Sequence, residues 1–378
     1  MTDTPLPTTT LQLRSLVTDD GAVQLSLEEA PLEAPTGSRV VVAVGAAPIN
    51  PSDLGLLLAG ADPAEATAAG TRERPIVRIA LPPAAQRAAR ARVGESLPAG
   101  NEGAGTVVAA GPDAGHLLGR TVAVAGGAMY ATHRAVDASA CLVLPEGTPA
   151  TAAASSFVNP MTVLGMLGTM RAEGHPALVH TAAASNLGQM LVRVCQEDGV
   201  GLVNVVRRPE QVALLRDLGA EHVVDSSADS FMGDLIEALD ATKATVAFDA
   251  TGGGDLGSRI LTAMEAVASR GEAFSRYGST THKQLYIYGG LDRSPTVLTR
   301  SFGFAWSVGG WLLTPYLHKA GAAEVEAMRQ RVAAGITTTF ASAYSATTSL
   351  AGALDLDTLR GYARQATGGK VLITPSAR

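Results

Sequence analysis

The sequence predicts an α/β protein in which a β-rich, barrel-like domain is joined to a doubly wound parallel sheet. The first 150 residues contain short β-type runs separated by Gly, Pro and Asp, a pattern typical of all-β domains. From Thr151 onward, buried strands alternate with amphipathic helices, as they do in open parallel sheets. The end of the chain returns to β-type residues. We therefore expect one domain at 1–150 with 336–378 and a second domain at 151–335.

The β-rich domain contains six short apolar runs and one long interruption. The runs are 11–17, 23–27, 39–44, 105–110, 120–125 and 141–144. The interruption, at about residues 60–99, is rich in alanine and carries prolines and charges, and we expect a helix in it at 84–93. We interpret this segment as an insertion in the barrel-like domain.

In the second domain, strands are expected to begin near residues 177, 202, 222, 245 and 284, and helices between them to lie on the sheet. Two of these strands end in glycine-rich turns, at the sheet edge where open α/β sheets bind ligands. The candidate ligand contacts in these turns are Thr251, Gly252, Tyr288, Gly289 and Gly290. Turn formation alone explains the glycines equally well. A helix at 322–334 and a strand at 370–374 complete the prediction.

The first strand of this domain, 177–181, leads into a turn of small residues and then a helix with an apolar face. The turn contains Ala183-x-Ser185-x-x-Gly188, the spacing of a dinucleotide-binding fingerprint with its first two glycines replaced. Such a turn places backbone N–H groups and the positive end of a helix dipole against a pyrophosphate. The residues expected to bind nucleotide are Ala183, Ala184, Ser185, Asn186, Leu187 and Gly188. A βαβ unit that binds nothing is the other interpretation.

The strand that follows, 202–206, ends in Arg207 and Arg208, with no carboxylate before Glu210. An acidic residue here would bind a ribose diol, whereas arginine binds a 2′-phosphate through two charge-assisted hydrogen bonds. The pair therefore favours NADP(H) over NAD(H). Two solvated arginines ahead of a helix that begins at Pro209 are the alternative.

The composition of the chain limits its partners. With 378 residues and 46% hydrophobic content, the chain is long enough for two domains. A net charge of -6 argues against a nucleic-acid partner. No apolar run reaches membrane-spanning length, and residues 1–10 do not resemble a secretion signal, so we expect a cytoplasmic protein. Cys141 and Cys195 lie in apolar runs and are expected to be reduced and buried.

Several motifs carry a resemblance to a known family. They are Ala47-Pro-Ile-Asn50-Pro-Ser-Asp53, Gly100-Asn101-Glu102-Gly-Ala-Gly105, Val158-Asn159-Pro-Met-Thr162, Leu218-Gly-Ala-Glu-His-Val-Val-Asp225 and Gly368-Gly-Lys-Val371. With the nucleotide turn, these motifs resemble the medium-chain dehydrogenase/reductase superfamily over nearly the whole chain. The most similar branch contains zinc-free quinone oxidoreductases and 2-enoyl thioester reductases. The resemblance implies a GroES-like catalytic domain packed on a Rossmann nucleotide domain, NADPH in the cleft, and a homodimer.

The residues needed for a zinc site are missing. Zinc-dependent relatives have a Cys where this chain has Asn50 and a His where it has Asn101, and 151–165 contains neither residue type. A structural four-cysteine site is impossible with two cysteines. We therefore expect no metal and no metal-assisted alcohol oxidation. His180, at the end of a buried strand, is expected to be packed.

Without a metal, the scaffold allows hydride transfer from nicotinamide to a quinone or to the β-carbon of an enone. Asn50 is the candidate to hydrogen-bond the cofactor or the substrate carbonyl, or else it caps the turn before Pro51. By resemblance, Asn159 and Thr162 lie near the nicotinamide, with helix capping as the alternative. Glu102 is expected to anchor backbone beside the cleft.

The tyrosine that enoyl thioester reductases carry shortly after the Asn-Pro-Ser-Asp segment is absent, since the first tyrosine of the chain is Tyr130. Its absence favours quinones and small enones, because a quinone can take its protons from water. Tyr130 and Tyr288 are expected either to reach the cleft or to pack. Phe304, Trp306 and Trp311 suggest a wall of the substrate pocket, or a domain or dimer contact.

We therefore predict a zinc-independent, NADPH-dependent reductase of quinones or activated alkenes. One alternative is a 2-enoyl thioester reductase, whose carrier phosphates would need a basic rim. Arginines of the insertion that can form such a rim are Arg72, Arg74, Arg78 and Arg87. The other alternative is a non-enzymatic NADPH-binding regulatory or scaffold protein, which would bind the cofactor without turnover.

Overall fold

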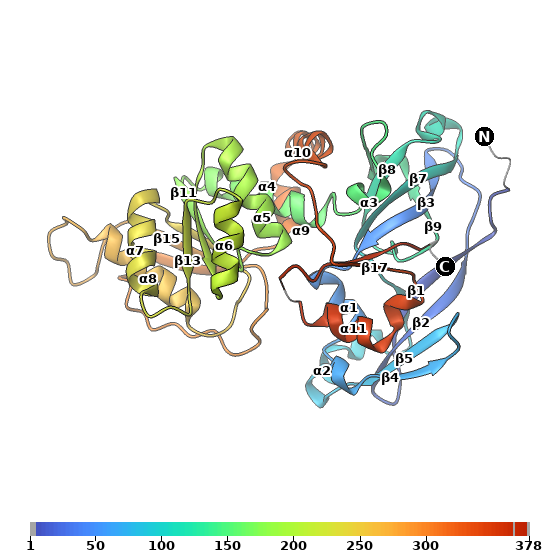
Figure 1. Cartoon of the computed structure of the whole chain (residues 1–378), viewed down its shortest axis with the longest axis horizontal. Coiled ribbons are helices and arrows are strands. Elements are labelled where there is room, and N and C mark those ends of the chain that lie inside the picture. The colour runs from blue at the N-terminus through green and yellow to red at the C-terminus, as the bar shows by residue number, and fades with distance from the viewer. Residues whose placement is uncertain (1–4, 366, 376–378) are drawn as a thin grey trace. The chain divides into compact units, whose positions relative to one another are not determined.

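The computed structural model describes residues 5–365 and 367–375 of the chain (Figure 1). These residues form two compact units, the first at 1–160 with 329–378 and the second at 161–328. The chain passes between the units within helix α4 (Val158–Ala172) and within helix α10 (Ala322–Gly335). The domain limits at residues 150 and 335 stay a prediction.

The first unit consists mainly of antiparallel strands. One sheet has the order β4-β5-β2-β1-β6, and the other has the order β10-β8-β7-β3-β18-β17, with β9 also paired to β3. The strands are β1 (Thr9–Val17), β2 (Ala22–Pro31), β3 (Arg39–Pro48), β4 (Thr67–Gly70), β5 (Pro75–Ala80), β6 (Ser96–Pro98), β7 (Glu102–Ala110), β8 (Thr121–Ala125), β9 (His133–Asp137), β10 (Cys141–Val143), β17 (Ala346–Thr348) and β18 (Val371–Ile373). The helices are α1 (Leu54–Leu58), α2 (Pro83–Ala88), α3 (Ala150–Ala153) and α11 (Leu356–Ala363).

Within the described residues these strands do not close into a barrel, so the barrel-like form of this domain stays a prediction. The terminal strands β4, β6, β10 and β17 each pair on one side only. The insertion contributes β4 and β5, which extend the first sheet beside β2. Its helix is shorter than expected, because α2 ends at Ala88 and a 3₁₀ turn at Arg90–Arg92 follows. At the other end of the chain, β18 pairs with β3 through Leu372 and Ile373.

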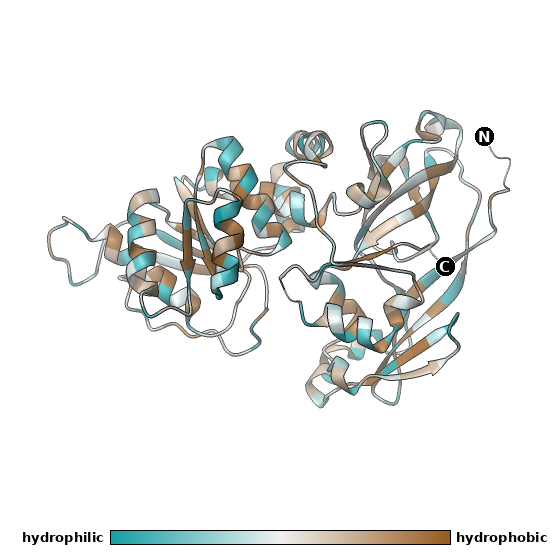
Figure 2. Ribbon diagram, viewed as in Figure 1, coloured by the Kyte–Doolittle hydropathy of each residue, from teal (hydrophilic) through white to brown (hydrophobic). Residues whose placement is uncertain are grey.

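The second unit is built on six parallel strands in the order β13-β12-β11-β14-β15-β16. The strands are β11 (Ala177–Thr181), β12 (Gly201–Val206), β13 (His222–Asp225), β14 (Val246–Asp249), β15 (Lys283–Ile287) and β16 (Trp306–Gly310). The remaining helices are α5 (Asn186–Asp198), α6 (Pro209–Asp217), α7 (Phe231–Thr242), α8 (Leu256–Ala268) and α9 (Leu313–Ala320). Figure 2 shows apolar residues concentrated in the sheet and polar residues on outer helix faces. Five of these strands were predicted. Strand β16 was not predicted, because its two glycines weaken the strand pattern.

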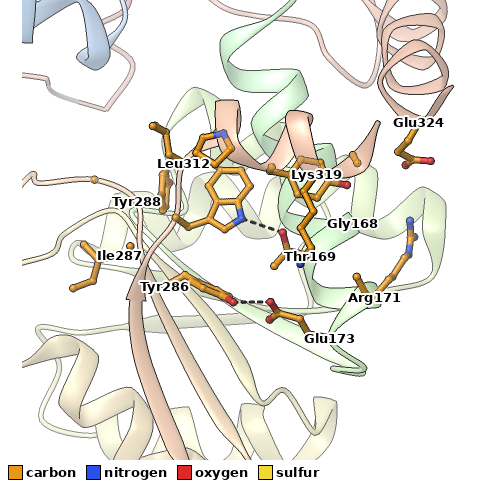
Figure 3. A pocket seen from close by; sticks show the side chains of 17 residues that line it. Gly168, Thr169, Arg171, Glu173, Tyr286, Ile287, Tyr288, Leu312, Lys319 and Glu324 are labelled. Carbon is orange, nitrogen blue, oxygen red and sulfur yellow. Dashed lines mark hydrogen bonds between the residues drawn. The ribbon is translucent and has the colours of Figure 1, made fainter. Parts of the chain in front are cut away.

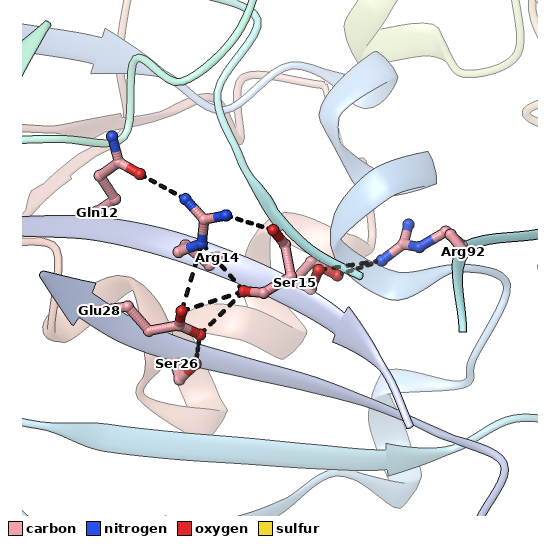
Figure 4. A network of polar contacts seen from close by, with 7 residues as sticks. Gln12, Arg14, Ser15, Ser26, Glu28 and Arg92 are labelled. Carbon is pink, nitrogen blue, oxygen red and sulfur yellow. Dashed lines mark hydrogen bonds and ion pairs between the residues drawn. The ribbon is translucent and has the colours of Figure 1, made fainter. Parts of the chain in front are cut away.

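Figure 4 shows a polar network that joins three strands of the first sheet. The Arg14 guanidinium on β1 donates to Gln12 Oε1 at 2.7 Å and to Ser96 Oγ at 3.0 Å, and it lies 3.4 Å from Glu28 Oε2 on β2. The donors of Arg14 are thus satisfied by Gln12 on its own strand and by Ser96 and Glu28 on the two neighbouring strands, as a partly buried guanidinium requires.

A buried ion pair fixes α8 against the start of β15. Lys283 is fully buried, and its Nζ lies 2.5 Å from Glu265 Oε2 and 2.9 Å from the carbonyl oxygen of Thr281. Partial burial alone would raise the pKa of Glu265, but the Lys283 ammonium and donors from Ser279 and Ser269 outweigh it and lower the pKa to about 2. The ionised carboxylate therefore stabilises the fold above about pH 4.5, and this stabilisation is lost as the pH falls towards 2.

The replacement Lys283→Met is expected to lower the free energy of unfolding by about 3 kcal/mol, because it leaves Glu265 buried without its cation. Urea unfolding followed by circular dichroism measures the loss. Lys243→Met is the matched control, since the Lys243 side chain is 64% exposed beside Asp240, and the loss there is expected to stay below about 1 kcal/mol. Equal losses in the two variants would contradict the role given to the buried pair.

Candidate active site

The turn that joins β11 to α5 has the geometry of a tight strand-to-helix connection. Ala182 adopts a left-handed conformation with φ of 50°. Ser185 caps α5, accepting a hydrogen bond on Oγ from the Gly188 N–H at 3.1 Å. A Cβ atom at Gly188 would lie 2.0 Å from the carbonyl oxygen of Ala183. The retained glycine of the fingerprint is therefore the one that close packing requires, and the turn places the N-terminus of a thirteen-residue helix after the strand.

A buried carboxylate holds the carboxyl ends of β11 and β14 together. Asp249 Oδ1 accepts from Thr181 Oγ1 at 2.7 Å and from the Thr251 N–H at 2.8 Å. Its Oδ2 accepts from the Gly252 N–H at 3.1 Å. This clamp sets the two strand ends, and hence the predicted contact residues that follow them, at fixed positions in the second unit.

The glycines after β14 and β15 allow their two turns to touch. A Cβ atom at Gly252 would lie 2.6 Å from the carbonyl oxygen of Gly289, and one at Gly289 would lie 2.6 Å from that of Ala250. Gly252 also has a φ of 77°, which favours glycine. Close packing of the two turns thus accounts for both glycines. Gly290 is exposed, with nothing near its ideal Cβ position.

His180 and Tyr288 form a buried pair in the second unit. His180 Nε2 lies 2.7 Å from Tyr288 Oη, and the two rings stack with centroids 5.9 Å apart. Burial lowers the pKa of His180 to about 3, so the imidazole is neutral at physiological pH. His180 is packed inside the sheet, and the hydroxyl of Tyr288 bonds to it.

Arg207 and Arg208 lie exposed at the point where β12 leads into α6. The Arg207 N–H donates to Gln211 Oε1 at 3.0 Å. Arg208 Nη1 lies 3.7 Å from Glu210 Oε1, and both side chains are more than half exposed. An ion pair this exposed is weak, so it is a small obstacle to a phosphate ligand.

In the first unit, Glu102 at the start of β7 joins two segments. The carboxylate is fully buried, and its Oε1 accepts from Asn50 Nδ2 at 2.9 Å. Its Oε2 accepts from the backbone N–H groups of Phe157 and Val158 at 2.8 and 2.9 Å. Glu102 thereby caps the start of α4 and orients the Asn50 carboxamide.

The orientation of Asn50 determines what it can bind. A carboxylate can only accept, so the group facing Glu102 is the Asn50 amide nitrogen. The other atom, Oδ1, is buried with no hydrogen-bond partner among the described residues. A buried acceptor without a donor is costly. Asn50 Oδ1 therefore suits a ligand N–H or O–H group. The second N–H of Nδ2 can still donate to a carbonyl, so the expected bond to the cofactor or the substrate carbonyl stays a prediction.

Asp53 completes this cluster from the 3₁₀ turn that follows Asn50. Its Oδ2 accepts from the Asn50 N–H and its Oδ1 from the Asn101 N–H, both at 2.8 Å. Burial raises the pKa of Asp53 to about 6, although these donors oppose the shift. The carboxylate fixes the backbone on both sides of the Asn50 carboxamide.

The remaining candidates differ in their surroundings. Tyr130 is fully buried and its Oη donates to the Pro48 carbonyl oxygen at 3.0 Å, so its hydroxyl holds backbone. This contact fits the packing alternative, and the catalytic role of Tyr130, which would require it to reach the cleft, stays a prediction. Asn159 and Thr162 are both buried and lie one turn apart on α4.

Sequence reasoning missed a chain of three polar side chains in the first unit. Lys370 Nζ donates to Ser155 Oγ at 2.8 Å, and Ser155 Oγ lies 2.9 Å from Tyr344 Oη. The motif that contains Lys370 was identified in the sequence. Its contact with Ser155 joins residues 215 positions apart, and the contact of Ser155 with Tyr344 joins residues 189 positions apart, so no local pattern indicated either contact.

A cavity of 940 Å³ lies in the second unit between α4, α9 and the ends of β15 and β16 (Figure 3). Its aromatic lining includes Trp311, whose Nε1 donates to Thr169 Oγ1 at 3.0 Å. Phe304 and Trp306 do not line this cavity. Phe304 is 78% exposed, and the ring of Trp306 packs on Phe302. Of the three aromatic residues predicted for a pocket wall, only Trp311 lines this cavity.

No group of three or more His, Cys, Asp or Glu side chains is placed to hold a metal ion within residues 5–365 and 367–375. Across the same residues, no helix combines the length and apolar character needed to cross a membrane.

The sequence is similar to a dehydrogenase family model and to two reductases. Residues 187–297 match the family model described as zinc-binding dehydrogenase. The chain is 30% identical over 215 residues to a mitochondrial enoyl-[acyl-carrier-protein] reductase of Rattus norvegicus, covering 54% of this chain and 50% of that protein. It is 28% identical over 176 residues to a quinone oxidoreductase of Pseudomonas aeruginosa, covering 46% and 53%. The chain thus spans about half the length of the curated relatives it matches.

Similarity to a solved structure extends over the whole fold. The structure of a Mesorhizobium loti protein assigned as an NADPH:quinone reductase aligns with a TM-score of 0.71 and 26% identity, over 98% of this chain and 100% of that one. Together with the dehydrogenase match in the second unit, this similarity supports the predicted membership of the chain in the medium-chain dehydrogenase/reductase superfamily.

Proposed function

We propose that the protein is an NADPH-dependent, zinc-independent oxidoreductase that reduces quinones or α,β-unsaturated carbonyl compounds. The observation that carries the proposal is the turn between β11 and α5, a phosphate-binding arrangement followed at the next strand end by Arg207 and Arg208. The proposal includes a Rossmann-type nucleotide domain, a GroES-like catalytic domain, a homodimer and a cytoplasmic location. Relatives named for NADPH:quinone reduction support the cofactor and the reaction class.

The residues present fit this cofactor. The backbone of residues 183–188 would hold the pyrophosphate, and the two arginines would hold the 2′-phosphate. Asn50 Oδ1, a buried acceptor without a donor among the described residues, would accept from the carboxamide or ribose of the nicotinamide end. When bound, the reduced nicotinamide would supply a hydride to an electron-poor acceptor. Glu102 and Asp53 would keep the Asn50 carboxamide in place.

Zinc independence is proposed from the chemistry of the two positions that ligate zinc in other members of the superfamily. Both are asparagines here, Asn50 and Asn101, and Asn50 already donates to Glu102. Carboxamides are poor replacements for thiolate or imidazole on Zn²⁺. The family model with zinc in its name matches only residues 187–297, which contain neither position.

The contacts of the insertion bear on the choice of acceptor. An enoyl thioester with a phosphorylated carrier would need free arginines, but Arg74 pairs with Glu29 at 2.9 Å and Arg78 pairs with Asp20. Arg72 and Arg87 remain exposed. Both ion pairs are exposed and therefore weak, so they are a small obstacle to a carrier phosphate. The preference for a quinone or small enone rests on the absence of a tyrosine after the Asn-Pro-Ser-Asp segment. Because one relative is an enoyl-[acyl-carrier-protein] reductase, an enoyl thioester is the second candidate substrate.

The proposed function is tested by NADPH oxidation, followed by absorbance, against quinones, small enones and enoyl thioesters. We expect turnover of quinones or enones, a slower rate with NADH, and rates unchanged by a metal chelator. Preference for thioesters would select the second candidate. Tight NADPH binding without turnover across a broad panel would instead support a regulatory or scaffold protein.

The double replacement of Arg207 and Arg208 by alanine is expected to raise the NADPH dissociation constant about 10- to 100-fold, because charge-assisted bonds to the 2′-phosphate are lost. The NADH constant should change less than about threefold, since NADH lacks that phosphate. Fluorescence titration measures both constants. Arg270→Ala, at another exposed arginine, is the control. Equal weakening of both cofactors would exclude the phosphate role.

The replacement Asn50→Ala is expected to lower kcat about 10- to 100-fold, since orientation of the reacting groups is lost. NADPH affinity should stay within a few-fold, because most contacts of the dinucleotide are made elsewhere. Steady-state kinetics and fluorescence titration separate the two effects. An unchanged kcat would return Asn50 to a purely structural role.

A further inference from the structure

We propose that Tyr344, Ser155 and Lys370 form a proton-delivery chain in which Tyr344 protonates a reduced enone. This inference rests on the proposed function and assigns its missing proton donor. None of the three residues belongs to the nucleotide turn, the arginine pair or the Asn50 cluster.

The fold brings the three side chains together from separate segments. Ser155 is fully buried between α3 and α4. Tyr344 and Lys370 stand just before β17 and β18, which pair in parallel. The Ser345 N–H donates to the Lys370 carbonyl oxygen at 2.9 Å, which extends that pairing towards both residues. The terminal segment of the first unit therefore presents a phenol and an ammonium to one buried hydroxyl.

The hydrogen bonds have a direction that suits delivery of a proton. An ammonium group can only donate, so Ser155 Oγ accepts from Lys370 Nζ at 2.8 Å. Ser155 then has its own proton for Tyr344 Oη, 2.9 Å away. With Ser155 as donor, the phenolic proton of Tyr344 can pass to a substrate oxygen or carbon in exchange for the bond of Tyr344 with Ser342, its other side-chain partner.

The electrostatic environment supports this assignment. Burial raises the pKa of Tyr344 to about 12, with Ser155 opposing the shift and Glu102 adding to it, so the phenol carries its proton at neutral pH. Burial lowers the pKa of Lys370 to about 8, against the attraction of Glu102 and Asp53. An amine in this range exchanges its proton readily near neutral pH.

The proton-delivery chain is also linked to the proposed substrate side of the first unit. Glu102 binds Asn50 Nδ2 with one oxygen and the N–H of Phe157, two residues after Ser155, with the other. The same carboxylate acts on both Tyr344 and Lys370 electrostatically. The proposed donor and Asn50 thus share one neighbouring carboxylate, that of Glu102.

When bound, the reduced nicotinamide would supply the hydride that forms a C–H bond at the β-carbon, and the C=C electron pair would move towards the carbonyl to give an enolate. Tyr344 gives its proton to the enolate, Ser155 gives its proton to the Tyr344 oxygen, and Lys370 gives its proton to Ser155. Solvent then returns a proton to the neutral Lys370 amine. The enone gains two electrons and two hydrogens, and the nicotinamide is oxidised.

The test compares Tyr344→Phe with wild type on an enone and a quinone, each with NADPH. For the enone, kcat is expected to fall about 100-fold, the scale of general acid catalysis. For the quinone, kcat should stay within about fivefold, since water can protonate the product. The Lys370→Gln variant should lower the enone kcat about tenfold. Tyr362→Phe is the matched control, because it removes a tyrosine hydroxyl that bonds to the Ala353 carbonyl oxygen and not to Ser155.

A second measurement does not depend on turnover. The chain has four lysines, so their ¹³Cε signals can be assigned by single substitutions. In the protein without cofactor, Lys370 is expected to titrate near pH 8, below the ordinary lysine value of 10.5. Titration of Lys370 at the ordinary lysine value would overturn the proposal, because the proton-delivery chain would then lack a group that exchanges protons near neutral pH.

The kinetic outcomes separate the inference from the function on which it rests. Wild-type turnover of neither acceptor would reject both. Turnover of quinones alone, an unchanged enone kcat in Tyr344→Phe, or an equal fall for both acceptors would overturn proton delivery while leaving the oxidoreductase proposal in place. NADPH affinity within about threefold of wild type, by fluorescence, is expected in every variant.

Discussion

The buried carboxylate of Glu102 is the constraint on which the first unit's candidate site depends. One carboxylate oxygen fixes the Asn50 carboxamide, and the other caps the first N–H groups of α4. A fully buried carboxylate is tolerated only when its oxygens are satisfied by donors. Because Glu102 can only accept, it also decides which atom of Asn50 is left without a partner. A glutamine at this position would allow the opposite orientation of Asn50.

In the second unit, a close steric contact and a buried carboxylate fix the positions of the candidate residues. Gly188 lets α5 begin directly against the turn, where a Cβ atom would meet the Ala183 carbonyl oxygen at 2.0 Å. Asp249 ties the ends of β11 and β14 through Thr181 and backbone N–H groups. The other two positions of the fingerprint are Ala183 and Ser185, and Ser185 contributes the helix cap that a glycine cannot make. A turn with Ala183 and Ser185 at the two glycine positions is therefore compatible with a capped start of α5.

Much of the fold could be predicted from the sequence because it depends on local periodicity. The five Val- and Leu-rich strands of the second unit follow this pattern, whereas β16, with Gly309 and Gly310, does not. A closed barrel could not be judged in this way, since closure depends on pairing between distant strand edges.

The candidate site was predictable where a motif is contiguous, as in the turn at 182–188. It was not predictable where side chains meet across long sequence separations. Tyr344 and Lys370 reach Ser155 only because β17 and β18 return to the first unit. The direction of the Asn50 carboxamide likewise required the position of Glu102.

Amide hydrogen exchange with and without NADPH tests the central claim most directly, because it reports on the backbone of the nucleotide turn itself. We expect the amides at 183–188 to exchange more slowly when NADPH is bound. NADH at equal concentration should protect the same amides less. Unchanged exchange in this turn at saturating NADPH, or protection confined to the residues that line the cavity between α4 and α9, would contradict that claim.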